Sequence, residues 1–278
     1  SDVYKRQVYY YKISAVAGEA FAMSDAVAIQ CQEPVKAEVD RVDGANRYET
    51  AVASADKLKD VYGVDKFDNI IVAYGDDYAD ALAGSYLAKA KKAPILLVNN
   101  AAEGYVKSYI DNNLNTGGTV YILGGEGVVS KNFAESITGY NIERLGGADR
   151  FETNLLILKE AGVADNDILT CSAWSFADSL SASSTGRPIL LVDNTLKSSQ
   201  KEFLATMANK NYYIIGGESV VSNDVATQLG AYGNTKRIRG ANRYETSKAM
   251  AETFFIKGSQ SLIIASGCLL YTSDAADD

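Results

Sequence analysis

The chain contains no histidine, and this absence removes several kinds of chemistry. Histidine is the usual general base near neutral pH, a member of Ser-His and Cys-His nucleophile pairs, and the commonest zinc ligand. The three cysteines, Cys31, Cys171 and Cys268, lie far apart and form no Cys-x-x-Cys pair. This spacing argues against a disulfide framework and against a thiolate zinc site. We therefore expect no enzyme, no metal site and no cofactor.

Long apolar runs and an excess of positive charge are also missing. No run approaches the roughly 18 apolar residues of a membrane span, so we expect none. The net charge is −8 and the isoelectric point about 4.8, which argues against a nucleic-acid partner. With 47% hydrophobic residues, the 278-residue chain can still bury ordinary cores. An acidic protein can also hold an anionic partner where its few arginines converge.

What the chain does contain is internal repetition. The segment Arg-x-x-Gly-Ala-Asn/Asp-Arg-Tyr/Phe-Glu-Thr begins at residues 41, 144 and 237. Three further blocks recur in the same order: an aromatic-Ala-Asp-Ala/Ser-Leu block, Pro-Ile-Leu-Leu-Val, and Tyr-Ile-Leu/Ile-Gly-Gly-Glu. Motif starts that lie this far apart indicate duplicated domains and not the turns of a solenoid. The second copy is shorter by about one helical turn between Asp178 and Pro188 than the first between Asp80 and Pro94.

Each copy has the pattern of a parallel α/β module. In the first copy, residues 70–73, 95–98 and 120–123 are short and continuously apolar, as in strands buried on both faces. Helix-length stretches, residues 80–91 and 103–114, lie between them. The predicted fold class is α/β: tandem small modules, each a mostly parallel sheet flanked by helices.

The repeated motif itself predicts the start of a helix. An Asn or Asp in N-cap position is followed three residues later by Glu, which is a capping-box pattern, and a glycine two residues earlier permits the preceding turn. The predicted caps are Asn46, Asp149 and Asn242, and their Glu partners are Glu49, Glu152 and Glu245.

The two ends of the chain differ from the repeats. Residues 8–16 and 20–29 predict two strands joined by a turn, and residues 8–37 resemble the last strand pair of a fibronectin type III sandwich, a β-hairpin remnant that lacks the rest of its domain. Residues 1–7 and 268–278 resemble translated sequencing read-through. We expect repeat one over residues 38–138, repeat two over 139–231, and a repeat three over 232–267 that is truncated after its first strand.

These ordered motifs resemble the cell wall-binding type 2 repeats of clostridia and related Gram-positive bacteria over roughly residues 38–267. The resemblance implies modules that occur in threes and pack around a pseudo-threefold axis. It also implies non-covalent attachment of a secreted, S-layer-associated surface protein to an anionic cell wall glycopolymer. The broken third copy departs from that pattern, and a site that needs all three copies would be incomplete.

The arginines are the principal candidates for polymer contact. Arginine at the first helical position opposes the helix dipole and calls for an anionic partner. That partner is either a polymer phosphate or carboxylate, gripped in a bidentate manner, or a carboxylate within the fold such as Asp80 or Asp178. The aromatic residue beside each arginine either stacks on a sugar or packs against the cap. The candidate residues are Arg41, Arg47, Tyr48, Arg144, Arg150, Phe151, Arg237, Arg243 and Tyr244.

The repeated aspartates and the Gly-Gly pairs have simpler structural interpretations. Asp80 and Asp178 stand where a strand turns into a helix, so each is predicted to cap that helix. A glycosidase would need an opposed carboxylate pair, whereas one acid recurs per copy. The Gly-Gly pairs at 124 and 216 match no phosphate-binding fingerprint, and we expect tight turns before helices capped by Ser130 and Ser222.

Three functions follow from these patterns. The first is a wall anchor that combines weak contacts to a repeating polymer. The second is an α/β enzyme that acts on nucleotides or glycans, since a parallel sheet is compatible with one. The third is a structural spacer between domains.

Overall fold

The computed structural model describes residues 8–11, 14–17, 20–23, 27–30 and 40–255. The chain forms two compact units, Ser1–Arg41 and Val42–Asp278. The two suspected read-through tails, the turn at Gly18-Glu19 and the predicted first strand of repeat three lie outside the described residues. No helix in the described part of the chain is long and apolar enough to cross a membrane.

The first unit contains two nested antiparallel strand pairs. Strand β1 (Val8–Tyr11) pairs with β4 (Val27–Gln30), and β2 (Ser14–Ala17) pairs with β3 (Ala20–Met23). The predicted antiparallel pairing is confirmed, with each predicted strand divided into two short ones. The likeness to a fibronectin type III domain stays a prediction.

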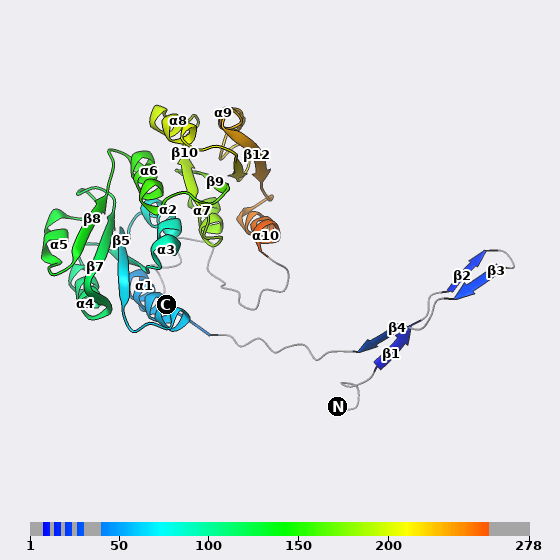
Figure 1. The fold of residues 1–278 in the computed structure, drawn as a ribbon, viewed down its shortest axis with the longest axis horizontal. Helices are drawn as coiled ribbons and strands as arrows, with labels where there is room; N and C mark the ends of the chain where they lie inside the picture. Colours follow the sequence, from blue (N-terminus) through cyan, green and yellow to red (C-terminus); the bar gives the residue numbers. More distant parts are fainter. Residues whose placement is uncertain (1–7, 12–13, 18–19, 24–26, 31–39, 256–278) are drawn as a thin grey trace, which may run out of the picture. The chain divides into compact units, whose positions relative to one another are not determined.

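The first module of the second unit is a four-stranded parallel sheet with helices on both faces (Figure 1). The strand order is β6-β5-β7-β8. Its elements are α1 (Arg47–Tyr62), β5 (Phe67–Tyr74), α2 (Ala79–Ala83), α3 (Ser85–Lys91), β6 (Ile95–Val98), α4 (Glu103–Asn113), β7 (Leu114–Leu123), α5 (Lys131–Ser136) and β8 (Asn141–Leu145).

The second module repeats this topology, with all strands parallel in the order β10-β9-β11-β12. One helix, α7, replaces the α2–α3 pair, which accounts for the missing turn seen in the sequence. The elements are α6 (Arg150–Ala161), β9 (Asp167–Ser172), α7 (Phe176–Ser183), β10 (Ile189–Val192), α8 (Ser198–Ala205), β11 (Lys210–Ile215), α9 (Asn223–Leu229), β12 (Gly233–Ile238) and α10 (Arg243–Phe254).

Each sheet takes its fourth strand from the sequence just before the next copy of the motif. Strand β8 pairs with β7 and is followed by the second motif, and β12 pairs with β11 and is followed by the third. The chain therefore leaves each sheet through a short turn and enters the helix that begins the next copy.

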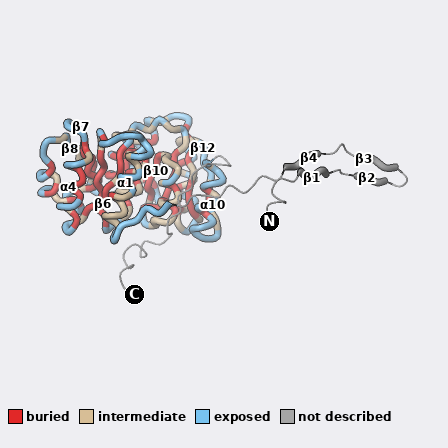
Figure 2. The backbone as a smooth tube through the Cα atoms, turned by 90° about the horizontal axis from the view of Figure 1, so that it is seen from below, coloured by how far each residue is buried: buried red, intermediate tan, exposed pale blue. Residues whose placement is uncertain are grey.

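The central strands are buried on both faces, as their continuous apolar sequence predicts. In β5, Ile70 and Val72 face a core formed with α1, α4 and α5, whereas Ile71 and Ala73 face the opposite side. All four residues are fully buried. Figure 2 shows the buried segments in the interior of the second unit, with exposed segments around them. A fully buried side chain of the size of Ile or Val contributes about 1.5–3 kcal/mol to folding, so these strands anchor the module.

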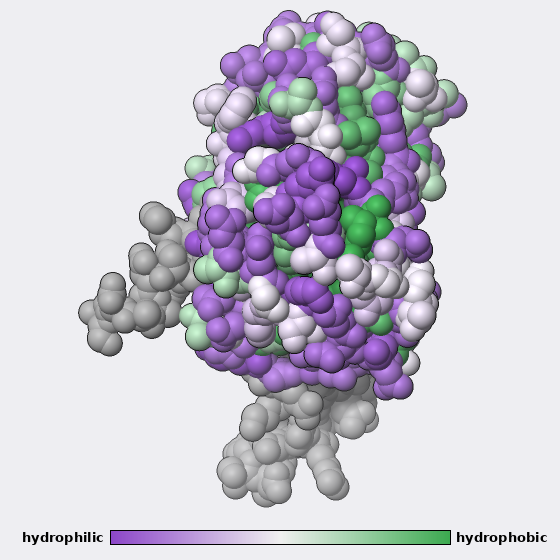
Figure 3. Space-filling model, turned by 90° about the vertical axis from the view of Figure 1, so that its left-hand side faces the viewer, coloured by the Kyte–Doolittle hydropathy of each residue, from purple (hydrophilic) through white to green (hydrophobic). Residues whose placement is uncertain are grey.

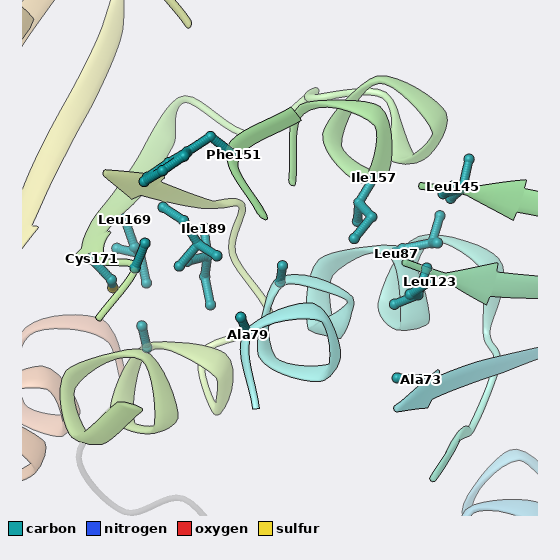
Figure 4. Packing of buried hydrophobic residues seen from close by; sticks show 14 of the residues in the cluster. Ala73, Ala79, Leu87, Leu123, Leu145, Phe151, Ile157, Leu169, Cys171 and Ile189 are labelled. Atoms are coloured by element: carbon teal, nitrogen blue, oxygen red, sulfur yellow. The ribbon is translucent and has the colours of Figure 1, made fainter. Parts of the chain in front are cut away.

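The two modules share one of their cores. Leu87 of α3 and Ile157 of α6 belong to a single buried cluster that also includes Leu123 of the first sheet and Leu169 of the second (Figure 4). Helix α6 packs against α2 and α3, and α10 packs in the same way against α7. The modules are thus joined by apolar packing, and the pseudo-threefold arrangement stays a prediction.

The outer surface differs from this interior. On the face shown in Figure 3, hydrophilic residues cover most of the surface and hydrophobic residues form small groups. Recognition of a partner on this face would therefore depend mainly on polar and charged groups.

Candidate functional site

The repeated motif begins a helix in all three copies, as predicted. Oδ1 of Asn46 accepts hydrogen bonds from the backbone N–H groups of Tyr48 (2.9 Å) and Glu49 (3.0 Å). Asp149 and Asn242 cap α6 and α10 through the same pair of bonds. Each arginine of the motif consequently occupies the first position of its helix.

The glutamate of the motif differs from the expected capping box. Oε2 of Glu49 accepts from the N–H of Ala45, the residue before the cap, at 3.0 Å. The reason is that the loop folds back over the first helical turn, where Gly44 also donates its N–H to Oγ1 of Thr50 at 3.1 Å. A Cβ atom on Gly44 would collide with Glu49, so the glycine serves close approach. The same contacts recur in the second and third copies.

The first-turn arginines reach the carboxyl ends of the first strands. Nη1 of Arg47 donates to the carbonyl oxygen of Gly75 at 2.6 Å, just after β5. Nη1 of Arg150 donates to the carbonyl oxygen of Ala173 at 2.7 Å, just after β9. These bonds hold each guanidinium at the carboxyl-terminal end of the parallel strands, which is a usual position for ligand sites in parallel α/β folds.

Carboxylates stand next to these two guanidinium groups. Nη1 of Arg47 is 3.6 Å from Oδ1 of Asp76, and Nη2 of Arg150 is 3.4 Å from Oδ2 of Asp77 in the other module. The arginine side chains are 27% and 25% exposed, and both aspartates are 44% exposed. Asp76 and Asp77 thus form the ion pairs of Arg47 and Arg150. Asp80 and Asp178, the acids suggested by the sequence, interact electrostatically with Arg150 and Arg243.

Arg243 begins the third copy and lies against the second module. Its guanidinium carbon is 5.2 Å from the ring centroid of Phe176 in α7. Its charge also opposes the burial that raises the pKa of Asp178. Arg150 and Arg243 each contact the preceding module, so both lie at junctions between copies.

The other repeated arginines bind the Gly-Gly turns. Arg144 donates to the carbonyl oxygens of Gly124 (3.0 Å) and Ser130 (3.4 Å). Arg237 donates to the carbonyl oxygen of Gly216 (2.9 Å) and to Oδ1 of Asn223 (3.2 Å), and burial lowers its pKa. Both of their terminal nitrogens thus have partners within the fold.

Arg41, the first candidate in the sequence, belongs to the other compact unit and is exposed.

The three motif aromatics have different surroundings. Tyr48 donates its hydroxyl to Oδ1 of Asp76 at 2.8 Å, and burial together with Asp76 raises its pKa to about 12. Tyr244 is 68% exposed. Phe151 is 3% exposed and belongs to the shared core, so of its two predicted roles the structure favours packing over contact with polymer. Packing is the role of Phe151, because its ring faces other side chains.

Asp80 and Asp178 are not N-caps, which corrects the prediction from the sequence. They lie inside the first turns of α2 and α7, whose caps are Tyr78 and Ser175. Burial raises the pKa of Asp80 to about 6, with a further contribution from Asp77, while Arg150 opposes the shift. Burial also raises the pKa of Asp178.

The two acids explain the Gly-Gly turns. Gly124 and Gly216 have φ values of 94° and 102°, which favour glycine. A Cβ atom on Gly124 would lie 2.7 Å from Oδ2 of Asp80, and one on Gly216 would collide with Asp178. The serine caps that follow are confirmed, since Oγ of Ser130 accepts from the N–H of Phe133 at 3.0 Å and Ser222 caps α9.

One residue at the carboxyl-terminal end of the second sheet was not recognised from the sequence as a candidate. Trp174 follows β9 and is 59% exposed, although it is the only tryptophan of the chain. The guanidinium carbon of Arg150 is 4.4 Å from its ring centroid, and its Nε1 donates to Oδ1 of Asp193 at 3.1 Å. Its position in the repeat could have pointed to it, because Trp174 corresponds to Asp76 of the first module. Among the described residues, no group of three or more His, Cys, Asp or Glu could hold a metal ion.

Comparisons with known proteins match both modules. The family described as Cell wall binding domain 2 (CWB2) matches residues 41–134 and 144–226. The chain is 30% identical over 214 residues to the N-acetylmuramoyl-L-alanine amidase LytC of Bacillus subtilis, covering 74% of this chain and 41% of LytC. It is 28% identical over 232 residues to the amidase enhancer of Bacillus subtilis, covering 80% of this chain and 30% of the enhancer.

The solved structure of Cwp6 from Clostridium difficile superposes with a TM-score of 0.69 at 26% identity, covering 88% of this chain and 39% of Cwp6. The chain therefore spans less than half the length of these relatives. An amidase and an amidase enhancer share the matched region, which indicates a module common to proteins of different activity. The chain belongs to the cell wall binding domain 2 family, and its two α/β repeats are cell wall binding modules.

Proposed function

We propose that these modules anchor a secreted, S-layer-associated surface protein non-covalently to the anionic polysaccharide of a Gram-positive cell wall, and that they catalyse no reaction. The observation that carries the proposal is the repeated guanidinium at each helix start, which in the first two copies is held by a backbone carbonyl and only loosely by carboxylates. The acidic chain thereby presents the same cationic group from successive copies.

The ion pairs at these arginines can exchange with polymer. A pair between exposed side chains contributes about 0–1 kcal/mol, because water screens it and both side chains lose freedom. Asp76 and Asp77 are both substantially exposed and lie beyond 3.3 Å from their arginines. A phosphate or carboxylate of the polymer that accepts two N–H bonds would compete with them effectively.

The remaining candidates support this contact in two ways. Arg144 and Arg237 donate to carbonyl oxygens of the Gly-Gly turns and would stabilise the conformation of these turns. Tyr244 is exposed and would extend the polymer contact, and Arg243 would repeat the role of Arg150 at the next junction. Arg41 is exposed and would offer a separate guanidinium to the polymer from the other compact unit.

Several weak contacts on one polymer give useful avidity, because the later ones form at high effective concentration. A pseudo-threefold packing of modules would align these contacts around one axis. Binding should weaken as salt rises, since exposed arginine–anion contacts are screened over about 8 Å at physiological ionic strength.

Retention on purified cell wall tests the proposal. We expect the chain to bind wall that retains its anionic polymer, and the variant Arg47→Gln/Arg150→Gln/Arg243→Gln to bind about tenfold more weakly or worse, as expected for a loss of about 1.4 kcal/mol or more. Circular dichroism melting checks that the variant folds.

The matched control is Lys107→Gln/Lys131→Gln/Lys248→Gln, which removes three positive charges that pair within their own helices. We expect the control to bind as the parent does. Equal retention of the parent chain on wall stripped of its anionic polymer would overturn the proposal.

A further inference from the structure

Trp174 and Asp193 lie at the carboxyl ends of two neighbouring parallel strands, β9 and β10. This edge is where parallel α/β sheets usually present ligand-binding loops. In the first module Asp76 and Asn99 follow the corresponding strands, and Nδ2 of Asn99 donates to Oδ2 of Asp76 at 3.2 Å. The second module thus has an indole where the first has a carboxylate.

The indole is fixed in place and still open to solvent. Arg150 covers one face at 4.4 Å, and the ring of Phe151 meets the indole at 75° with centroids 6.1 Å apart. The bond from Nε1 to Asp193 fixes the rotation of the ring. More than half of the side chain nevertheless remains exposed, so the uncovered surface is a preorganised apolar platform.

Polar groups surround this platform. Oδ1 of Asp193 accepts from Trp174 and from the backbone N–H of Asn194 at 2.9 Å, and within the described chain no bond to its Oδ2 competes with a ligand. Nζ of Lys197 lies 4.9 Å from the ring centroid of Phe151, which itself contacts the indole. An apolar surface with a few placed acceptors and donors is the general composition of a small-ligand site.

The charges at this cluster nearly cancel. Arg150 and Lys197 are positive, whereas Asp193 and the nearby Asp77 are negative. A neutral ligand with an apolar face and several hydroxyl groups fits these surroundings better than an isolated anion does. A pyranose ring has this character, since its axial C–H groups form an apolar face and its hydroxyls lie at its edge.

We propose that Trp174 and Asp193 form a subsite for a neutral pyranose residue of the wall polysaccharide, with the ring stacked on the indole and a hydroxyl donating to Oδ2 of Asp193. The proposal rests on the wall-binding function and adds the sugar to the anionic groups recognised by the arginines. The subsite belongs to the second module, because the first has no aromatic residue at this position.

Tryptophan fluorescence tests the subsite directly, since Trp174 is the only tryptophan of the chain. The probes are the neutral oligosaccharide released from purified wall by hydrofluoric acid, and inorganic phosphate. We expect the oligosaccharide to shift the emission to shorter wavelength, to saturate, and to protect the indole from acrylamide quenching. The response should persist at high salt, and phosphate should give none. An unchanged emission with the oligosaccharide would overturn the subsite.

Wall retention gives a second measurement. Trp174→Ala should reduce retention about tenfold, the size typical of truncating a central aromatic contact, and Trp174→Phe should restore part of it. The matched control is Tyr105→Ala, which removes an exposed aromatic ring from α4. Parent-like retention of Trp174→Ala would also refute the subsite.

The two proposals fail in different ways. If the parent chain bound stripped and native wall equally, the electrostatic anchor would fail while the fluorescence response to oligosaccharide remained a valid measurement. If wall binding depended on the anionic polymer but Trp174→Ala changed nothing, the subsite alone would fail.

Discussion

Asp80 carries a carboxyl group into surroundings that disfavour its charge. It lies in the first turn of α2 against the Gly124 turn, and burial raises its pKa to about 6, with Asp77 adding to the rise and Arg150 opposing it. In the unfolded chain an aspartate has a pKa of about 3.9. The folded state therefore retains a proton that the unfolded state has already released between roughly pH 4 and pH 6.

This difference in pKa determines how the folding stability changes with pH. Because the folded state binds more protons in that window, the contribution of Asp80 to stability falls as the pH rises from about 4 to about 6 and then levels off. We expect Asp80→Asn to show little difference from the parent near pH 4 and to be more stable by roughly 1–3 kcal/mol above pH 6. Urea unfolding at several pH values measures this difference, and Asp65→Asn, which removes an exposed carboxylate, controls for charge alone. A difference that does not change with pH would contradict this role of Asp80.

At the scale of single elements, the helix starts were predictable and the arginine contacts were not. A cap depends on residues two or three positions apart, so Asn46 and Glu49 could be recognised from sequence alone. Arg47 donates instead to Gly75, 28 residues away, and only the folded sheet defines that contact. For the same reason the pattern did not predict that Asp80 lies inside a helix and not at its cap, and it left open whether Phe151 packs or contacts polymer.

The cap of α1 gives a prediction at this scale. Replacing Asn46 with Ala removes the acceptor for two backbone N–H groups, and we expect a loss of about 1 kcal/mol in the free energy of unfolding. Asn46→Asp should remain close to the parent, because Asp149 makes the same two bonds in the second module. Guanidinium unfolding of both variants measures the effect. An equal loss in both would show that the amide nitrogen, which donates to Glu49 at 2.9 Å, matters more than the cap oxygen.

At the scale of the whole second unit, the sequence predicted two similar modules but not how they adhere. The duplicated strands and helices follow from local patterns that recur along the chain. The shared core depends on which helix face meets the neighbouring module, and the helix patterns do not specify that choice. Helix α6 contributes to two buried clusters, with Ile157 in the shared one and Leu155 in one that is formed by the second module together with Tyr86 of α3.

Because the modules share a core, we expect a destabilising substitution in the first module to lower the stability of the second as well. Leu87 of α3 is fully buried there, so Leu87→Ala should cost about 2–5 kcal/mol through lost burial and a residual cavity. Trp174 reports on the second module, because it follows β9. We expect the substitution to lower the unfolding midpoint seen by Trp174 fluorescence together with the midpoint seen by circular dichroism. Ile110→Ala in the outer core of the first module provides a comparison, since that cluster contains residues of the first module only. A Trp174 transition that stayed at the parent midpoint in Leu87→Ala, while circular dichroism lost amplitude earlier, would mean that the modules fold independently despite their contact.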